Sequence, residues 1–160
     1  MKSSRLLTEF LEKGTCKQVK SRIFVVHGHD SAAVFELKDF LMTLGLDPIL
    51  LFQQDDLGLT IVEKFERYAE ECVFAFIILT PDDKQANALS GLEKWRARQN
   101  VILEAGWFMR KLGRQGVVLL HKGEVELPSD LLGILYLPFT KSIFEVSEKI
   151  RQRLRGQGLL

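Results

Sequence analysis

The sequence predicts one α/β domain built on a five-stranded parallel sheet with helices on both faces. From Arg22 onward, short apolar runs alternate with amphipathic segments, as they do in βαβ units. The short runs are almost continuously apolar, which is what strands buried on both faces of a parallel sheet require. The chain has 160 residues, enough for one such domain with a full core, and its composition is that of an ordinary globular protein.

The expected elements follow each other in chain order. Residues 1–20 should form a short helix and a linker, and residues 21–160 the domain itself. Strands are expected over 23–27, 48–52, 73–80, 116–121 and 134–139, and helices over 34–45, 60–71, 100–113 and 142–154. Asp30 or Ser31 can cap the first of these helices and Thr60 the second, while Gly45 and Gly113 can end the first and the third.

Polar residues follow each of the first four strands, in the segments 27–30, 53–56, 80–83 and 121–124. The carboxyl ends of parallel strands share one edge, and ligands bind there, where the strand order reverses. With the order 2-1-3-4-5, the crevice lies between the first and third strands. The helix that carries Glu104 begins beside it.

Glu104 is the main candidate for a catalytic residue. It stands among apolar residues, directly after a segment with two arginines and two amides, RARQN. A carboxylate near a helix N-terminus has a plain structural explanation, because the helix dipole favours it there. However, its neighbours on the helix surface are largely apolar and include no basic partner three or four residues on. A partly buried carboxylate that faces a polar crevice is therefore a candidate catalytic group.

The loop at 27–30 has two open interpretations. Gly28 can let the backbone approach a ligand, with phosphate at the following helix N-terminus. Alternatively, Gly28 makes a tight turn and Asp30 only caps the helix. His27 and His29 have no third ligand at a suitable spacing, so no metal site is expected.

Composition and motifs exclude several classes of protein. A net charge of +1 argues against a general nucleic-acid binder. Cys16 and Cys72 are isolated, which suits a reducing cytoplasm, and the longest apolar run, residues 73–79, is too short to cross a membrane. No signal peptide is expected. The sequence also lacks a GxSxG motif, a P-loop lysine motif and a CxxC motif.

Several motifs together resemble the bacterial TIR-like nucleotide-binding family. They are VVHGHD, GLDPILL, G-x-TIVEKFE, IILTPDD, RARQNVILEAGWF-x-x-KLGR and PSDLLGILYLPF, in order from about Arg22 to Phe139. The resemblance implies a flavodoxin-like TIR fold. It also implies an NAD⁺ glycohydrolase that acts as the effector of a cyclic-nucleotide-triggered antiphage system, as in TIR-STING fusions.

The resemblance also implies roles for individual residues. Glu104 would be the catalytic acid. Gly28, His29 and Asp30 would border the nucleotide pocket, and Arg98 and Asn100 would lead into the catalytic helix. The segment 53–60 would be the mobile loop that TIR domains use in assembly.

Three positions depart from the family pattern. Gln53 stands where many relatives have an acidic residue, and Leu59 where many have a basic one. Asn100 stands where broader TIR enzymes often carry tryptophan. The aromatic ring that stacks on the substrate must then come from Phe52 or Trp107.

The implied reaction expels neutral nicotinamide and leaves an oxocarbenium-like ribose, which one ionised carboxylate can stabilise. Glu104 would do this, while Arg98 and the helix N-terminus after Gly28 hold the pyrophosphate. NAD⁺ would be a substrate, with no separate cofactor. Expected partners are further copies of the chain, through TIR–TIR contacts, and a cyclic-nucleotide sensor outside these 160 residues. Two alternatives stay open: a non-catalytic assembly or nucleotide-binding module, and a nucleoside N-glycosidase or ribosyltransferase.

Overall fold

The main sheet has the predicted strand order. The computed structural model describes residues 20–86, 93–123, 125, 126, 128 and 134–160, so the helix expected within residues 1–20 falls almost wholly outside the described residues. Five parallel strands pair in the order β2-β1-β3-β6-β7. They are β1 (Arg22–His27), β2 (Asp47–Ile49), β3 (Phe74–Leu79), β6 (Val117–Lys122) and β7 (Leu135–Phe139). Counted along the chain this is 2-1-3-4-5, and the flavodoxin-like α/β prediction is confirmed.

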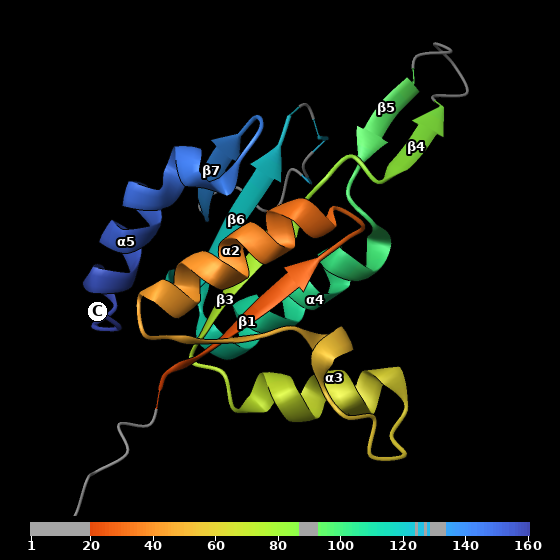
Figure 1. Cartoon of the computed structure of the whole chain (residues 1–160). Helices are drawn as coiled ribbons and strands as arrows, with labels where there is room; N and C mark the ends of the chain where they lie inside the picture. Colours follow the sequence, from red (N-terminus) through yellow and green to blue (C-terminus); the bar gives the residue numbers. More distant parts are fainter. Residues whose placement is uncertain (1–19, 87–92, 124, 127, 129–133) are drawn as a thin grey trace, which may run out of the picture.

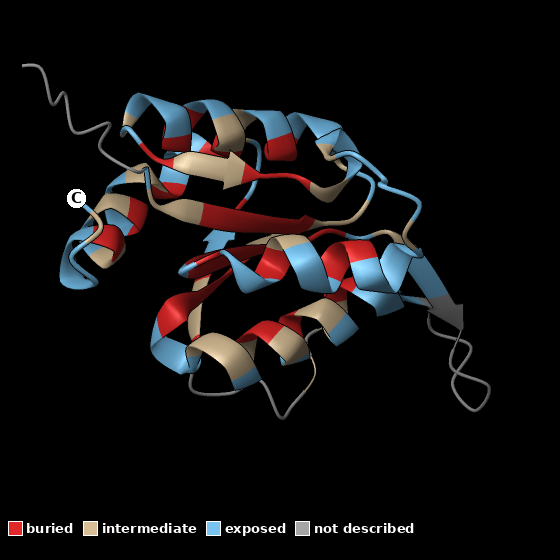
Figure 2. Ribbon diagram, turned by 90° about the horizontal axis from the view of Figure 1, so that it is seen from below, coloured by how far each residue is buried: buried red, intermediate tan, exposed pale blue. Residues whose placement is uncertain are grey.

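Helices cover both faces of the sheet (Figure 1). They are α2 (Ser31–Thr43), α3 (Ile61–Glu70), α4 (Gln99–Leu112) and α5 (Ser147–Gly156), with short 3-10 turns η1 (Leu51–Gln53), η2 (Arg114–Gly116) and η4 (Ile143–Val146). One apolar cluster joins α2, η4 and α5 to the sheet, and a second joins α3 and α4 to it. Adjacent residues of β1 and β3 enter opposite clusters, which explains why these strands are apolar throughout. Figure 2 shows the buried residues on the strands and on the helix sides that face them.

The predicted helix ends agree with the structure. Asp30 caps α2, since its side chain accepts a hydrogen bond from the backbone N–H of Ala33. Thr60 forms a capping box with Glu63 at the start of α3. Gly113, with φ of 68°, follows α4. The expected helix over 142–154 is divided into η4 and α5, and the expected strand over 48–52 ends at Ile49.

An antiparallel hairpin, β4 (Asp83–Ala86) and β5 (Glu93–Arg96), was not predicted. It projects away from the main sheet (Figure 1). Ion pairs link it to the rest of the chain, since Lys94 and Arg96 both contact Glu126, at 3.0 and 2.5 Å. Because polar contacts rather than an apolar face hold the hairpin, it has no hydrophobic alternation from which it could have been predicted. In the described parts of the chain, no helix has the length and apolar character needed to span a membrane.

Candidate active site around Glu104

A pocket of about 300 Å³ opens where β1, the segment after β2, α3 and α4 meet. It lies on the α3 side of β1, not between β1 and β3 as the sequence predicted. Strand β1 supplies the floor, and the other elements supply the walls. The lining residues are Phe24, Val25, Val26, His27, Leu51, Phe52, Asp56, Ile61, Lys64 and Glu104.

Glu104 reaches this pocket from α4. It is half-buried, and no described residue forms a hydrogen bond or ion pair with its carboxylate. Burial raises the pKa of Glu104 to about 7, although the positive charge of Arg98 acts to lower it. The first turn of α4 holds no acidic residue, so Glu104 lies beyond the reach of the helix dipole. Stabilisation by the helix dipole therefore does not explain this carboxylate, and its position in the pocket supports a functional role.

Phe52 provides the aromatic ring at the pocket rim. Its ring meets the His27 ring edge-on at 5.3 Å, and the residue is 55% exposed. Trp107, the other candidate for stacking, does not line the pocket. It packs against Phe65 and Phe108 instead. Of the two candidates, only Phe52 is in a position to stack on a ligand in this pocket.

Lys64 is a pocket residue that the sequence analysis missed. It is only 8% exposed, and its Nζ donates a hydrogen bond to Asp56 Oδ1 at 2.6 Å. A signal was present in the sequence. Lys64 occupies a position on the apolar stripe of α3, three residues after Ile61 and four before Tyr68. A lysine on the buried face of an amphipathic helix is uncommon unless it is paired or has a function.

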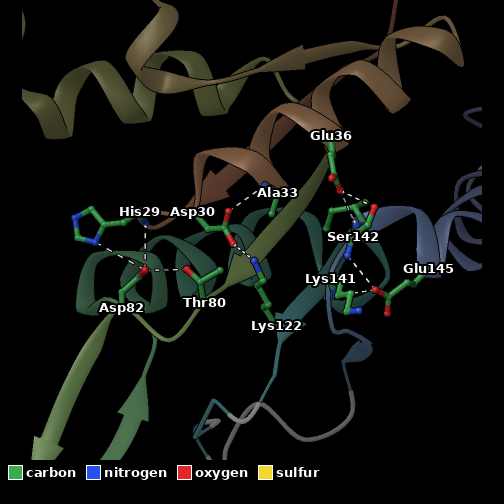
Figure 3. Close-up of polar contacts among 11 residues, drawn as sticks. His29, Asp30, Ala33, Glu36, Thr80, Asp82, Lys122, Lys141, Ser142 and Glu145 are labelled. Atoms are coloured by element: carbon green, nitrogen blue, oxygen red, sulfur yellow. Dashed lines mark hydrogen bonds and ion pairs between the residues drawn. The ribbon is translucent and has the colours of Figure 1, made fainter.

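The loop 28–30 belongs to a polar cluster whose residues do not line the pocket (Figure 3). Both carboxylate oxygens of Asp82 accept from the backbone N–H of His29, at 3.3 and 3.4 Å, and one accepts from the Thr80 hydroxyl at 2.9 Å. Asp30 accepts from Lys122 Nζ at 2.5 Å as well as from the amide of Ala33. Burial acts to raise the pKa of Asp30, but these hydrogen bonds hold it below its ordinary value.

Gly28 is required by a contact within the protein. A Cβ atom at this position would lie 1.7 Å from Asp82 Oδ2. The group that lies close to the Gly28 backbone is thus the Asp82 carboxylate. Gly28, His29 and Asp30 do not line the pocket, so their role in binding substrate stays a prediction.

Arg98 lies between the polar cluster and the pocket. It is the N-cap residue of α4, and its Nη1 is 3.4 Å from Nε2 of His29. Arg98 and Asn100 are exposed and do not line the pocket, but the charge of Arg98 acts on Glu104. Among the described residues, no group of three or more potential ligands is placed to hold a metal ion.

The contact between Gly28 and Asp82 predicts a strong coupling between two substitutions. Gly28→Ala is expected to lower the free energy of unfolding by about 1–3 kcal/mol, because it forces Asp82 away from His29 and Thr80. In an Asp82→Ala background, the same alanine is expected to cost clearly less, because the clash with Asp82 is gone and only the 3.2 Å approach to Thr80 Oγ1 remains. Urea unfolding of both single variants and the double variant measures this. An equal cost of Gly28→Ala in both backgrounds would contradict the account.

Comparison with known proteins relates this geometry to a family. Residues 22–141 match the family model described as "CAP12/Pycsar effector protein, TIR domain". The chain is 43% identical over 125 residues to "Uncharacterized protein YuaY" of Escherichia coli (strain K12), which covers 78% of this chain. It is 33% identical over 150 residues to "Protein tirC" of Dictyostelium discoideum, covering 88% of this chain. It is 32% identical over 148 residues to "Pycsar effector protein BcPycTIR" of Burkholderia cepacia, covering 85%.

The matches cover different shares of these relatives. The matched region is 42% of YuaY, 74% of tirC and 46% of BcPycTIR. Two of these relatives are thus more than twice as long as the part that resembles this chain.

Proposed function

Because this chain belongs to the CAP12/Pycsar effector TIR-domain family, we propose that it is an antiphage effector that cleaves NAD⁺ to nicotinamide and ADP-ribose. The name of the Burkholderia relative supports the effector role, since it is called a Pycsar effector protein. The observation that carries the proposed reaction is the carboxylate of Glu104, which is half-buried in a pocket and has no partner among the described residues.

The bond to be broken joins ribose C1′ to the nitrogen of a cationic pyridinium ring. Its electron pair leaves with neutral nicotinamide, so the leaving group needs no proton. Positive charge then develops on the ribose, and a carboxylate in a partly desolvated pocket stabilises it. Water adds to C1′ and releases a proton, which ionised Glu104 is able to accept, since burial brings its pKa to about 7.

The remaining residues of the site have supporting roles in this proposal. Phe52 stacks on a flat ring of the substrate at the rim of the pocket. Arg98 keeps part of the Glu104 population ionised at neutral pH. His29 and Asn100 are exposed beside Arg98 and contact the outer part of the substrate, while Gly28 and Asp30 hold the loop that presents His29.

We further propose that the active form is a homo-oligomer and that a cyclic-nucleotide sensor controls its assembly. Leu57, Ile61 and Val62 support self-association, because they form exposed apolar surface next to the pocket; Ile61, itself a lining residue, is 79% exposed. Activity should therefore rise more steeply than in proportion to protein concentration.

A substrate panel tests the proposed reaction against its alternatives. The concentrated chain is incubated with NAD⁺ and, separately, with purine and pyrimidine nucleosides, and the released bases are separated by chromatography. Free nicotinamide from NAD⁺ supports the proposal. Bases released from nucleosides alone would identify an N-glycosidase. No release from any substrate, even at concentrations where the chain is oligomeric, would favour the non-catalytic assembly module.

The pH dependence of the reaction should follow Glu104. We expect kcat/KM to rise with pH, with a midpoint near 7, because the ionised carboxylate is the active form and its pKa is about 7. Arg98→Met removes a positive charge that lowers this pKa, and should move the midpoint to higher pH. Arg110→Met, at the far end of α4, serves as the control and should leave it in place. An unchanged midpoint in Arg98→Met would contradict this assignment.

A further inference from the structure

Lys64 places a positive charge inside the pocket at a cost that its protein contacts only partly offset. The ammonium group has three hydrogen-bond donors. Among the described residues, its one acceptor is Asp56 Oδ1 at 2.6 Å. The side chain of Asp56 is 83% exposed, whereas that of Lys64 is 10% exposed. A buried ammonium held by a single exposed carboxylate can exchange that partner easily, because Asp56 regains full hydration when it leaves.

We propose that Lys64 binds the phosphates of a nucleotide substrate, and that the carboxylate of Asp56 holds this place in the free protein. This inference rests on the proposed function, since it assigns a second part of the same substrate within the same pocket. It predicts that the substrate is a nucleotide that carries phosphate, and not a neutral nucleoside.

The charges of the pocket match the two parts of such a molecule. Glu104 and Lys64 both line it, with Phe24 and Val26 of β1 among the apolar residues of the floor. The ammonium group of Lys64 pairs with Asp56, whereas the positive charge that acts on Glu104 is that of Arg98. The acidic and basic groups of the pocket therefore act separately. NAD⁺ has a cationic nicotinamide ring and an anionic pyrophosphate, which suit Glu104 and Lys64 respectively.

The start of α2 is a poorer place for the phosphates. The backbone amides of His29 and Ala33 already donate to the carboxylates of Asp82 and Asp30, as Figure 3 shows. A phosphate there would have to displace two negative groups or lie against them. Of the two cations nearby, Lys122 is itself paired with Asp30, and Arg98 is exposed and does not line the pocket. Lys64 is the cationic side chain that lines the pocket.

Replacement of the Asp56 carboxylate by phosphate at Lys64 would also affect the loop after β2. Asp56 belongs to the segment that supplies Leu51 and Phe52 to the pocket wall. When phosphate replaces Asp56 at Lys64, this segment loses one of its bonds to α3. It keeps the bonds from Lys38 Nζ to Gln53 and from the Tyr68 hydroxyl to the carbonyl of Asp55. Substrate binding would thus remove one contact of the loop while these two contacts hold.

The test compares two substrates that share the reacting bond. NAD⁺ carries a pyrophosphate, and nicotinamide riboside carries no phosphate. Lys64→Met, which has similar length and no charge, is expected to raise KM for NAD⁺ about 10- to 100-fold with little change in kcat, because charge-assisted hydrogen bonds are lost. It should lose far less kcat/KM with nicotinamide riboside. Lys64→Arg should recover most of the loss, because it restores the charge.

Two further variants sharpen the comparison. Lys38→Met removes a lysine that bonds to the same loop but does not line the pocket, so it is the matched control and should behave like the parent. Asp56→Asn weakens the internal competitor, so it should lower KM for NAD⁺. An unchanged KM for NAD⁺ in Lys64→Met would overturn the proposal. An equal loss on both substrates would overturn it too, because a merely structural role predicts that result.

A binding measurement separates this inference from the proposed reaction. Calorimetric titration with ADP-ribose compares Glu104→Gln with Glu104→Gln/Lys64→Met. Binding that depends on Lys64 supports the phosphate site even where the parent releases no nicotinamide, in which case the proposed reaction fails alone. If the parent releases nicotinamide but the two variants bind ADP-ribose equally well, the Lys64 site is overturned and the proposed reaction stands. Absence of ADP-ribose binding at millimolar concentration also overturns it.

Discussion

Glu104→Gln is expected to lower the rate of nicotinamide release from NAD⁺ by about a thousandfold or more. Glutamine has nearly the same size and shape as glutamate, but it carries no negative charge and cannot accept a proton from water. It would therefore leave the pocket intact while removing the group that stabilises the cationic ribose. Initial rates of nicotinamide release, measured by chromatography at pH 8 and equal protein concentration, give the comparison.

Glu66→Gln is the matched control for this experiment. Glu66 is exposed on α3 and does not line the pocket, so this variant should keep the activity of the parent. Glu104→Asp should also be severely impaired, because the carboxylate is withdrawn by one methylene from the reacting carbon. A rate for Glu104→Gln within a few-fold of the parent would exclude Glu104 as the catalytic group.

The same substitution should stabilise the fold at alkaline pH. Burial raises the pKa of Glu104 from 4.5 to about 7, so the folded state holds a proton that the unfolded state has already released. Stability from this group is fully present below pH about 4.5 and is lost as pH rises through 7. The loss amounts to at most about 3 kcal/mol at pH 8. Glutamine does not ionise, so Glu104→Gln should not lose this stability as the pH rises.

Urea unfolding at pH 5 and pH 8 measures this effect. Glu104→Gln should differ little from the parent at pH 5 and should be more stable at pH 8. Glu66→Gln should show no such dependence on pH. If Glu104→Gln were instead less stable than the parent at pH 8, the carboxylate would be making a stabilising contact, and its assignment as a partly desolvated catalytic group would be wrong.

The fold was largely predictable because local signals agreed with each other. The apolar runs located the five strands of the main sheet, and Asp30, Thr60 and Gly113 marked helix ends correctly. The hairpin of β4 and β5 was missed because the contacts of Lys94 and Arg96 with Glu126 link segments distant in sequence. The second strand was predicted too long, because the apolar run continues into η1.

The candidate site was predictable only in part. Glu104 could be identified from the sequence, because its neighbours on one helix and the family resemblance both indicate it. The position of the pocket is not local, because it depends on which side of β1 the loop after β2 packs. The sequence left open whether Gly28 admits a ligand or only makes a turn, and only the three-dimensional structure places Asp82 against it. Lys64 was recognisable as an unusual residue on an apolar stripe, but its pairing with Asp56 required the folded loop.

A crystal structure of Glu104→Gln with intact NAD⁺ tests the central claim most directly, since this variant should bind the substrate without cleaving it. We expect the nicotinamide riboside to occupy the pocket between Phe52 and position 104, with the pyrophosphate at Lys64 and Asp56 turned away. NAD⁺ bound instead at the cluster of His29, Asp82 and Lys122, with the pocket left empty, would contradict the account.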